Sequence, residues 1–316
     1  MEALSLTDKD VLPFHIIINE NAGTVLSMGQ DALTALINET LGNRVQDINY
    51  VQGKGMAKAL AAVLENKKGH ILVGGGDGTI ASCASLLIKD KVPFGILPLG
   101  TMNLLARDLN IPVDIKAALE SYKHCKLLEI DAGRINDYIF LCNVAVGLIP
   151  EASILREETR KTPSLGSWSN LVAAVFQGLD KSNRRRFRLR HHNRRHVVNG
   201  NVLVIANNAY ADSAGLPSDR LHRNVLTDGQ LAVYSAGPSS FVGTLRLLLK
   251  LAVGLNWQKD EAVHRFFAKN LQLESRKKTI MVAIDGEPMN VKAPARIEIL
   301  PQALPLLVPD EAAVNG

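Results

Sequence analysis

Apolar positions in the first part of the chain follow two alternating patterns. Short runs of consecutive apolar residues predict buried strands, and apolar residues spaced three and four positions apart predict amphipathic helices. The expected strands are 14–18, 44–51, 71–73 and 92–97, and the expected helices are 31–41, 56–64, one from Thr79, one from Thr101 to Asn110 and one after Asp114. Strands that alternate with helices are typical of a parallel sheet with helices on its faces.

The pattern changes after about Leu127, where strand-like runs separated by turn residues dominate. The expected strands are 128–135, 138–144, 187–190, 202–206, 231–234, 280–284 and 304–308, with helices near 167–179 and 241–255. We therefore predict an α/β N-terminal domain with a parallel sheet and flanking helices, followed by a β-rich, antiparallel, sandwich-like C-terminal domain. The expected boundaries are 1–128 and 129–295, with the tail 296–316 packing back on the first domain.

Composition adds little to this picture but excludes some classes of protein. The chain has 316 residues, of which 47% are hydrophobic, so it can form two globular cores. A net charge of +5 mildly favours anionic partners such as nucleotides or an anionic membrane. Cys83, Cys125 and Cys142 have no metal-ligand spacing, and Leu245–Leu255 is too short and too charged to span a bilayer. Without a signal-peptide pattern, we expect a cytoplasmic protein, peripheral at most at the inner face of the membrane.

The most informative motif is Gly74-Gly75-Gly76-Asp77-Gly78-Thr79, which lies between an expected strand and an expected helix. Glycines in such a turn let the backbone approach a phosphate closely, and the helix N-terminus adds free N–H groups. Asp77 adds a carboxylate that a magnesium–phosphate network could use. The alternative is a tight turn in which Thr79 merely caps a helix. The motif is neither a P-loop nor a dinucleotide-binding fingerprint.

Two further motifs have weaker signals when each is taken alone. In the segment Leu97–Arg107, Thr101 and Asn103 follow a strand and a glycine turn, where they could contact a nucleotide or simply cap a helix. At Asp285-Gly286-Glu287, two carboxylates share a turn after a strand. One could accept a hydroxyl proton while the other orients it or holds a metal, but a solvated acidic turn would look the same.

Taken in order along the chain, these motifs resemble the diacylglycerol kinase catalytic-domain family, in its bacterial soluble lipid-kinase branch. Sphingosine kinases and NAD kinases are relatives of this family. The resemblance begins at Asn19–Gly23, continues through the two glycine motifs and Glu129–Gly133, and closes with Thr227–Leu231 and the acidic turn. It implies a kinase that uses ATP and Mg²⁺, bound between an α/β domain and a β-rich domain, and serves phospholipid biosynthesis.

The resemblance also implies roles for individual residues. The expected nucleotide-binding residues are Asn19, Ala22, Gly23, Gly75, Gly76, Asp77, Gly78, Thr79 and Thr101, to which the local pattern adds Asn103. The expected metal ligands are Asp228 and the backbone carbonyls of Val225 and Gln230. Asp285 and Glu287 match the acidic pair that supplies the proton acceptor, and either could be the base.

The expected reaction is phosphorylation of diacylglycerol to phosphatidic acid. Three alternatives stay open: phosphorylation of another lipid such as a sphingoid base or phosphatidylglycerol, phosphorylation of a small alcohol, and a non-catalytic nucleotide- or lipid-binding regulator. The segment Lys181–Arg195 is strongly basic and could contact an anionic membrane, although a solvated basic surface would have the same composition. Nucleic acid is a poorer partner, because this stretch has a single aromatic residue for stacking. A homodimer is compatible with the sequence.

Overall fold

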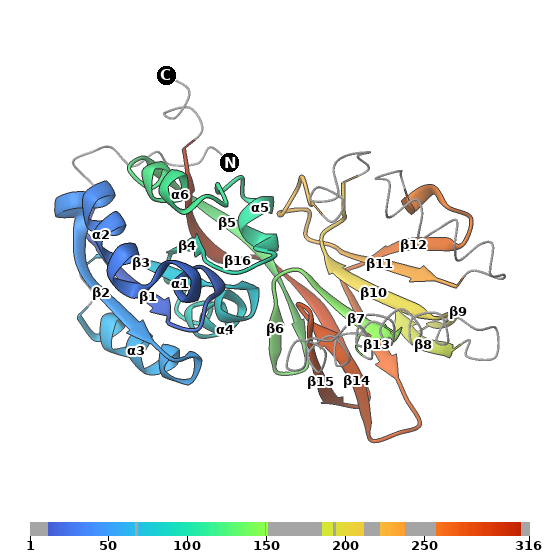
Figure 1. Cartoon of the computed structure of the whole chain (residues 1–316). Coiled ribbons are helices and arrows are strands. Elements are labelled where there is room, and N and C mark those ends of the chain that lie inside the picture. Colours follow the sequence, from blue (N-terminus) through green and yellow to red (C-terminus); the bar gives the residue numbers. More distant parts are fainter. Residues whose placement is uncertain are drawn as a thin grey trace, which may run out of the picture. The chain divides into compact units, whose positions relative to one another are not determined.

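The computed structural model describes residues 12–66, 69–148, 150, 185–191, 194–211, 222–237 and 257–310 (Figure 1). The chain divides into two compact units, one formed by residues 1–130 and 302–316 and the other by residues 131–301. The helices expected near 167–179 and 241–255, including the amphipathic segment Leu245–Leu255, lie outside the described residues.

The first unit contains the alternating strands and helices that the apolar pattern predicts. Its elements are β1 (Phe14–Asn19), α1 (Gly23–Met28), α2 (Gln30–Leu41), β2 (Val45–Val51), α3 (Met56–Asn66), β3 (His70–Gly75), α4 (Asp77–Leu87), β4 (Phe94–Pro98), α5 (Leu104–Asp108) and α6 (Ile115–Ser121). Strands β2, β1, β3 and β4 are neighbours in this order and all pair in parallel. The second half of β16 (Ala295–Pro309) adds a further parallel strand beside β4.

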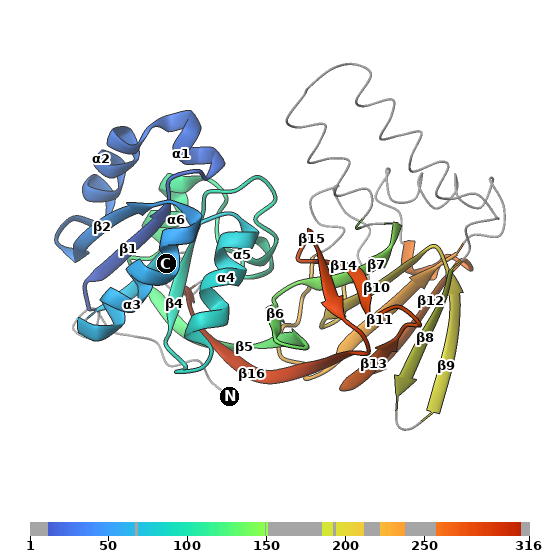
Figure 2. The ribbon, with the colours of Figure 1, turned by 90° about the horizontal axis from the view of Figure 1, so that it is seen from below.

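The parallel sheet is apolar on both faces because helices cover both. On one face, Phe14, Ile16 and Ile18 of β1 share a core with residues of α2 and α6. On the other face, α3 contacts β1, α4 contacts β3, and the two helices contact each other (Figure 2). The buried Tyr122 hydroxyl donates to the Ile96 carbonyl and accepts from the Ile96 N–H, which joins the end of α6 to β4.

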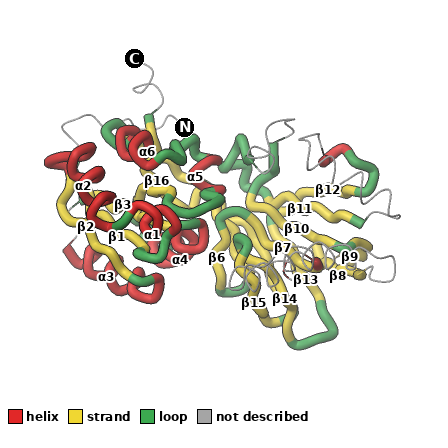
Figure 3. Tube along the Cα trace, viewed as in Figure 1, coloured by secondary structure: helices red, strands yellow, loops and turns green. Residues whose placement is uncertain are grey.

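In its described residues, the second unit consists mainly of strands and the turns between them (Figure 3). Its strands are β5 (Cys125–Ile135, which begins in the first unit), β6 (Tyr138–Phe140), β7 (Asn143–Gly147), β8 (Arg185–His191), β9 (Arg194–Gly200), β10 (Val202–Asn207), β11 (Leu231–Ala236), β12 (Val263–Ala268), β13 (Asn270–Glu274), β14 (Thr279–Ile284), β15 (Glu287–Lys292) and the first half of β16. One antiparallel sheet has the order β12-β11-β10-β7-β14-β15. A second group of strands has the order β16-β13-β8-β9, and β5 and β6 pair with each other beside β16.

One apolar core lies between these two layers of the second unit. It includes Val144, Leu203 and Ile284 from the first sheet, and Leu189 and Ile297 from the second group of strands. Two layers of mainly antiparallel strands around a shared core form a sandwich. The predicted fold class, an α/β unit followed by an antiparallel β-rich unit, is confirmed.

Several predicted boundaries are wrong, and their corrections have local reasons. Strand β3 continues through Gly74 and Gly75, and helix α4 begins at Asp77 instead of Thr79. Only Gly76 therefore separates the strand from the helix. Helix α5 is short and begins at Leu104 instead of Thr101, because Asn103 has φ of 49° and cannot continue a right-handed helix. The single strand expected at 138–144 is two strands, β6 and β7, with a break at Leu141 and Cys142.

No helix in the described part of the chain is long and apolar enough to cross a membrane. The three cysteines are free and buried.

Candidate active site

The carboxyl ends of three neighbouring parallel strands bring the predicted nucleotide-binding residues of the first unit together. Strands β1, β3 and β4 end at Asn19, Gly75 and Pro98, and each is followed by a turn and a helix. Ligands of open parallel sheets bind at this edge, where helix N-termini and loops converge. Three motifs far apart in the sequence therefore form one cluster.

The glycine turn after β3 leaves backbone N–H groups open at the start of α4. Gly76 precedes the helix, and no side chain caps it. The first N–H groups of a helix have no intrahelical partner, so those of Asp77, Gly78 and Thr79 can bind an anion. A Cβ atom at Gly75 would lie 2.6 Å from Thr79 side-chain atoms, so this position requires glycine.

The turn after β1 is joined to this helix by a side-chain hydrogen bond. The Asn19 amide donates to the Thr79 hydroxyl at 2.9 Å, and the Asn19 side-chain oxygen accepts from the Asn21 N–H. Helix α1 then begins after Ala22, again without a side-chain cap, so Gly23 contributes another open N–H group. The N–H groups of Ala22 and Thr24 donate to the carbonyls of Asn19 and Leu99, so this turn adds the single Gly23 donor to those at the start of α4.

In the turn after β4, Asn103 and Thr101 differ in their environments. The Asn103 side chain is buried and forms hydrogen bonds with the N–H of Gly100 and the carbonyls of Gly100 and Pro98. Its amide therefore holds the turn in shape, whereas Thr101 is exposed and can reach a ligand.

Asp77 links the two glycine turns. Its carboxylate accepts a hydrogen bond of 2.7 Å from the Leu104 N–H at the start of α5. Burial raises the pKa of the Asp77 carboxyl, and hydrogen bonds from Leu104 and neighbouring N–H groups partly offset this effect. Asp77 thus fixes α5 relative to α4, in addition to any part it takes in binding a metal–phosphate complex.

The two glycine turns also touch each other directly, which leads to a testable prediction. In Gly100→Ala, the new Cβ would lie 2.5 Å from the Gly76 Cα and 2.8 Å from the Asn103 Oδ1, so the turns must separate. We expect a loss of ~1–3 kcal/mol in the free energy of unfolding, as in other overpacked sites. We also expect ATP affinity to fall about tenfold or more, because the N–H groups move apart. Thermal unfolding and titration with a fluorescent ATP analogue measure the two effects.

Gly53→Ala is a matched control for this experiment. Its new Cβ would have only an ordinary contact, 3.9 Å from the Asn19 amide nitrogen. Equal losses in the two variants would show that the contact between Gly76 and Gly100 is unimportant.

In the second unit, Asp285 and Gly286 form the turn between β14 and β15. Ile284 pairs with Glu287 across the hairpin, and Asp285 and Gly286 have φ values of 47° and 90°. A two-residue turn with two positive φ values is the type that Asp-Gly favours. The backbone that connects Asp285 to Glu287 therefore has a defined conformation.

The Asp285 carboxylate is fully engaged by the backbone. One oxygen accepts from the N–H of Leu141 at 2.7 Å, and the other accepts from the N–H groups of Cys142 and Asn143 at 2.8 and 2.9 Å. Burial raises the pKa of the Asp285 carboxyl, while these N–H groups and the nearby Arg223 guanidinium act in the opposite direction. The N–H groups of Leu141, Cys142 and Asn143 turn toward Asp285, and this explains the break between β6 and β7.

Glu287 is different. Its side chain is exposed, and no hydrogen bond or ion pair of its carboxylate is recorded within the described part of the chain. Of the two acidic residues, only Glu287 has both oxygens available to a substrate.

Arg223 and Asn207 support this acidic turn, and the sequence patterns did not point to either of them. The guanidinium of the buried Arg223 donates to the carbonyls of Leu141 and Asn207, each at 2.7 Å. The Asn207 amide donates to the carbonyls of Leu141 and Asp131. A lone arginine between turn residues has no periodic or motif signal, so only the folded chain shows that it lies under the acidic turn.

The expected metal loop packs on the same network. The Asp131 carboxylate accepts from the Gly229 N–H at 2.7 Å, and the Gln230 carbonyl accepts from the Asn208 N–H. Asp228 is exposed. The donors expected there, one carboxylate and the carbonyls of Val225 and Gln230, are oxygens and suit a hard cation such as Mg²⁺.

Two observations bear on how this loop could hold a cation. The side-chain oxygen of the fully buried Asn208 has no hydrogen-bond partner among the residues that the structure describes, which leaves an additional oxygen donor next to the loop. No cluster of three or more His, Cys, Asp or Glu side chains suited to a metal is present among the residues that the structure describes. A cation here would therefore depend on backbone and amide oxygens together with Asp228.

Comparisons with known proteins agree with this architecture. Residues 13–135 match the family model for the diacylglycerol kinase catalytic domain, and residues 150–308 match the model for the YegS C-terminal NAD kinase beta sandwich-like domain. The chain is 27% identical to "Probable lipid kinase YegS-like" from Klebsiella pneumoniae, over 95% of this chain and 97% of that one. It is 24% identical to the "Uncharacterized protein sll0036" of Synechocystis, over 94% of this chain and 70% of that one.

The fold is also similar to a solved structure. The crystal structure of a diacylglycerol kinase from Bacillus anthracis aligns with a TM-score of 0.65 and 16% identity, over 95% of this chain and 97% of that chain. The solved structure shows the same fold, and the two family models together span both units of the chain. This protein belongs to the diacylglycerol kinase catalytic-domain family.

Proposed function

We propose that this protein is an ATP-dependent lipid kinase that phosphorylates diacylglycerol to phosphatidic acid. The family membership supports a phosphotransferase, and the curated relative from Klebsiella is named a lipid kinase. The observation that carries the proposal is the contrast in the acidic turn. Asp285 is held by three N–H groups, while Glu287 is exposed and its carboxylate has no hydrogen bond or ion pair among the described residues, so it can accept a proton.

In the proposed reaction, the open N–H groups around Gly76–Thr79 and the N–H group of Gly23 bind the phosphates of ATP. The oxygen of the lipid hydroxyl attacks the γ-phosphorus, and the bond from that phosphorus to the β-phosphate oxygen breaks, which releases ADP. Glu287 accepts the hydroxyl proton, and Asp285 keeps the hairpin turn in place. The protein's main contributions are positioning and charge stabilisation, as in other phosphoryl transfers.

A Mg²⁺ ion bound with ATP would neutralise phosphate charge during the transfer. We propose that Asp228 and the carbonyls of Val225 and Gln230 hold a second, structural Mg²⁺. The exposed position of Asp228 and the oxygen-only donor set support this assignment.

The test is transfer of labelled phosphate from ATP, with magnesium, to diacylglycerol in mixed micelles. Sphingosine, phosphatidylglycerol, glycerol and a total lipid extract serve as competing acceptors. Labelled phosphatidic acid as the main product is the expected result. Label on another acceptor would show that the proposed reaction is right but that its substrate is not diacylglycerol. Binding of ATP without transfer to any acceptor would instead favour the alternative, a regulator that binds nucleotides or lipids.

A further inference from the structure

The strands β16, β13, β8 and β9 of the second unit have one apolar face and one basic face. Phe187 and Leu189 of β8 and Leu271 and Leu273 of β13 point into the core of the sandwich. Successive side chains of a strand point to opposite sides, so the residues between them lie on the outer face. We call this outer face the arginine face; its basic members are Arg186, Arg188, Arg190, Arg195 and Arg296.

Strand pairing places several of these arginines directly beside one another. Arg190 pairs with Arg195 on β9, and on its other side with Gln272, which in turn pairs with Arg296. This row therefore carries three arginines across four strands. Like charges directly opposite each other destabilise a sheet, so the arrangement works against the stability of the isolated protein. An anionic surface laid over the row would remove that repulsion.

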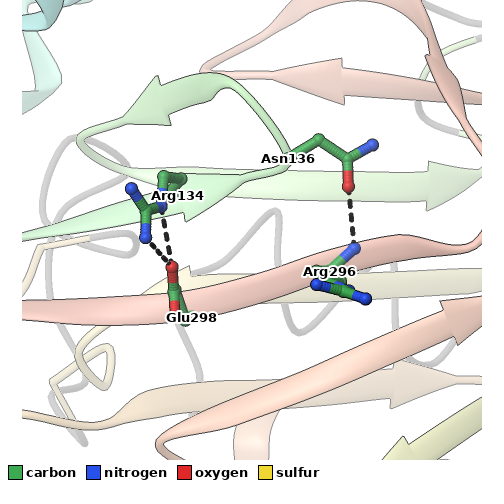
Figure 4. A network of polar contacts seen from close by, with 4 residues as sticks. All are labelled: Arg134, Asn136, Arg296 and Glu298. Carbon is green, nitrogen blue, oxygen red and sulfur yellow. Dashed lines mark hydrogen bonds and ion pairs between the residues drawn. The ribbon is translucent and has the colours of Figure 1, made fainter.

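Few acidic side chains compensate this charge. Glu298 is paired with Arg134 from β5, and the neighbouring Arg296 N–H donates to the Asn136 side chain (Figure 4). Glu274 lies 3.6 Å from Arg195, whose side chain is still 73% exposed. Within the described chain, no ion pair is recorded for the guanidinium groups of Arg186, Arg188 and Arg190, so the face keeps a strong positive charge.

The arginine face also exposes an apolar side chain. Val197 pairs with Arg188 on the outer side of the hairpin and is 57% exposed. It lies on β9, the last strand in the described order of this sheet (Figure 2). Basic residues around an exposed apolar residue suit the boundary between lipid headgroups and acyl chains. Sites for single-stranded nucleic acid combine positive charge with aromatic side chains on which bases stack, and the outward positions of β8 and β9 carry no aromatic residue.

We propose that the arginine face docks on a bilayer that contains anionic phospholipids. This inference rests on the proposed function, because a kinase for a membrane-bound lipid must reach its substrate in the bilayer. The headgroup phosphates lie between the guanidinium groups of Arg190, Arg195 and Arg296, and Val197 enters the interface. The docking is electrostatic, so it weakens as salt concentration rises.

The experiment measures binding to vesicles of phosphatidylcholine, with or without phosphatidylglycerol, in the absence of ATP and diacylglycerol. The variant Arg186→Gln, Arg188→Gln, Arg190→Gln, Arg195→Gln removes four positive charges from the arginine face. Each basic residue contributes about fivefold to binding of an anionic surface, so we expect the partition coefficient to fall about 100-fold or more. Unmodified protein should bind the mixed vesicles in a salt-dependent way and bind phosphatidylcholine vesicles weakly.

A matched control removes the same charge from elsewhere on the surface. Lys58→Gln, Lys89→Gln, Lys116→Gln and Lys123→Gln change four exposed lysines of the first unit. Comparable losses in both variants would overturn the proposal, because net charge alone would then explain binding. The double variant Arg190→Gln, Arg195→Gln, checked by thermal unfolding, replaces the fourfold variant if that one does not fold. Its expected loss is about 25-fold.

Two further arms separate the alternative anions. Inorganic phosphate at matched ionic strength should not displace the protein from mixed vesicles, and displacement would indicate a site for free phosphate. Tighter binding to single-stranded nucleic acid than to mixed vesicles, lost in the same variant, would overturn the assignment to membranes. Activity toward diacylglycerol in detergent micelles is measured separately. Vesicle binding without kinase activity contradicts only the proposed function, and kinase activity without vesicle binding contradicts only the arginine-face proposal.

Discussion

Replacing Asp285 by asparagine is expected to destabilise the second unit strongly. Asparagine tolerates the positive φ of this position, so the backbone of the turn is preserved. The substitution turns one accepting oxygen into an NH₂ group that faces an N–H donor of Leu141, Cys142 or Asn143. Hydrogen bonds to charged groups contribute ~1.5–3 kcal/mol each, so we expect the free energy of unfolding to fall by about 2–4 kcal/mol. Urea unfolding followed by tryptophan fluorescence and circular dichroism measures this loss.

Asp137→Asn is the matched control, because Asp137 is an exposed aspartate in another hairpin turn of the same unit. Its stability should stay within about 0.5 kcal/mol of that of the unmodified protein, as for most surface substitutions. If Asp285→Asn were equally harmless, the Asp285 carboxylate would not be the anchor that joins β14 to the turn before β7.

Replacing Glu287 by glutamine is expected to reduce activity strongly and to leave stability unchanged. The side chain is exposed and its carboxylate has no hydrogen bond or ion pair with any other residue that the structure describes, so the free energy of unfolding should not change. A general base contributes about 10²–10⁴-fold to a rate, and glutamine cannot accept the proton. We therefore expect kcat for lipid phosphorylation to fall by about 10²–10⁴-fold while ATP affinity is retained. Steady-state kinetics with diacylglycerol, together with an ATP titration, measure both quantities.

Glu287→Asp keeps a carboxylate on a shorter side chain and should recover part of the activity, and Asp137→Asn should retain full activity. A normal kcat in the Glu287→Gln variant would show that another residue acts as the base. A fall in stability instead of kcat would show that Glu287, like Asp285, serves the hairpin.

The alternation of apolar runs and helical spacing was sufficient to predict the fold class. Strands such as β1 and β3 are buried at almost every position because both faces of the parallel sheet are covered, so each has a run of three consecutive apolar residues that can be recognised locally. The strands β12, β13 and β15 were missed. Segments such as 263–268 and 287–292 mix polar with apolar residues, because one of their faces is exposed, and a short half-polar segment has a weak signal.

Local turn chemistry was also predictable. The Asp285-Gly286 pair adopts the positive φ values that these residue types favour, and the glycine motif marks the turn before α4, so both motifs locate their turns correctly. Neither the position of the helix starts nor the function of each side chain follows from the motif. Asn103, for example, looks like a ligand-binding amide in the sequence, but its side chain forms hydrogen bonds within its own turn.

The sequence by itself determined the two-part architecture and the positions of the glycine and acidic turns, because both depend on residues close together in the chain. Only the tertiary structure decided how the two carboxylates of the acidic turn differ. The N–H groups that hold Asp285 belong to Leu141, Cys142 and Asn143, which precede it in the chain by between 142 and 144 positions. No local pattern encodes a contact across such a separation; it exists only after β7 and β14 have paired in the folded sheet.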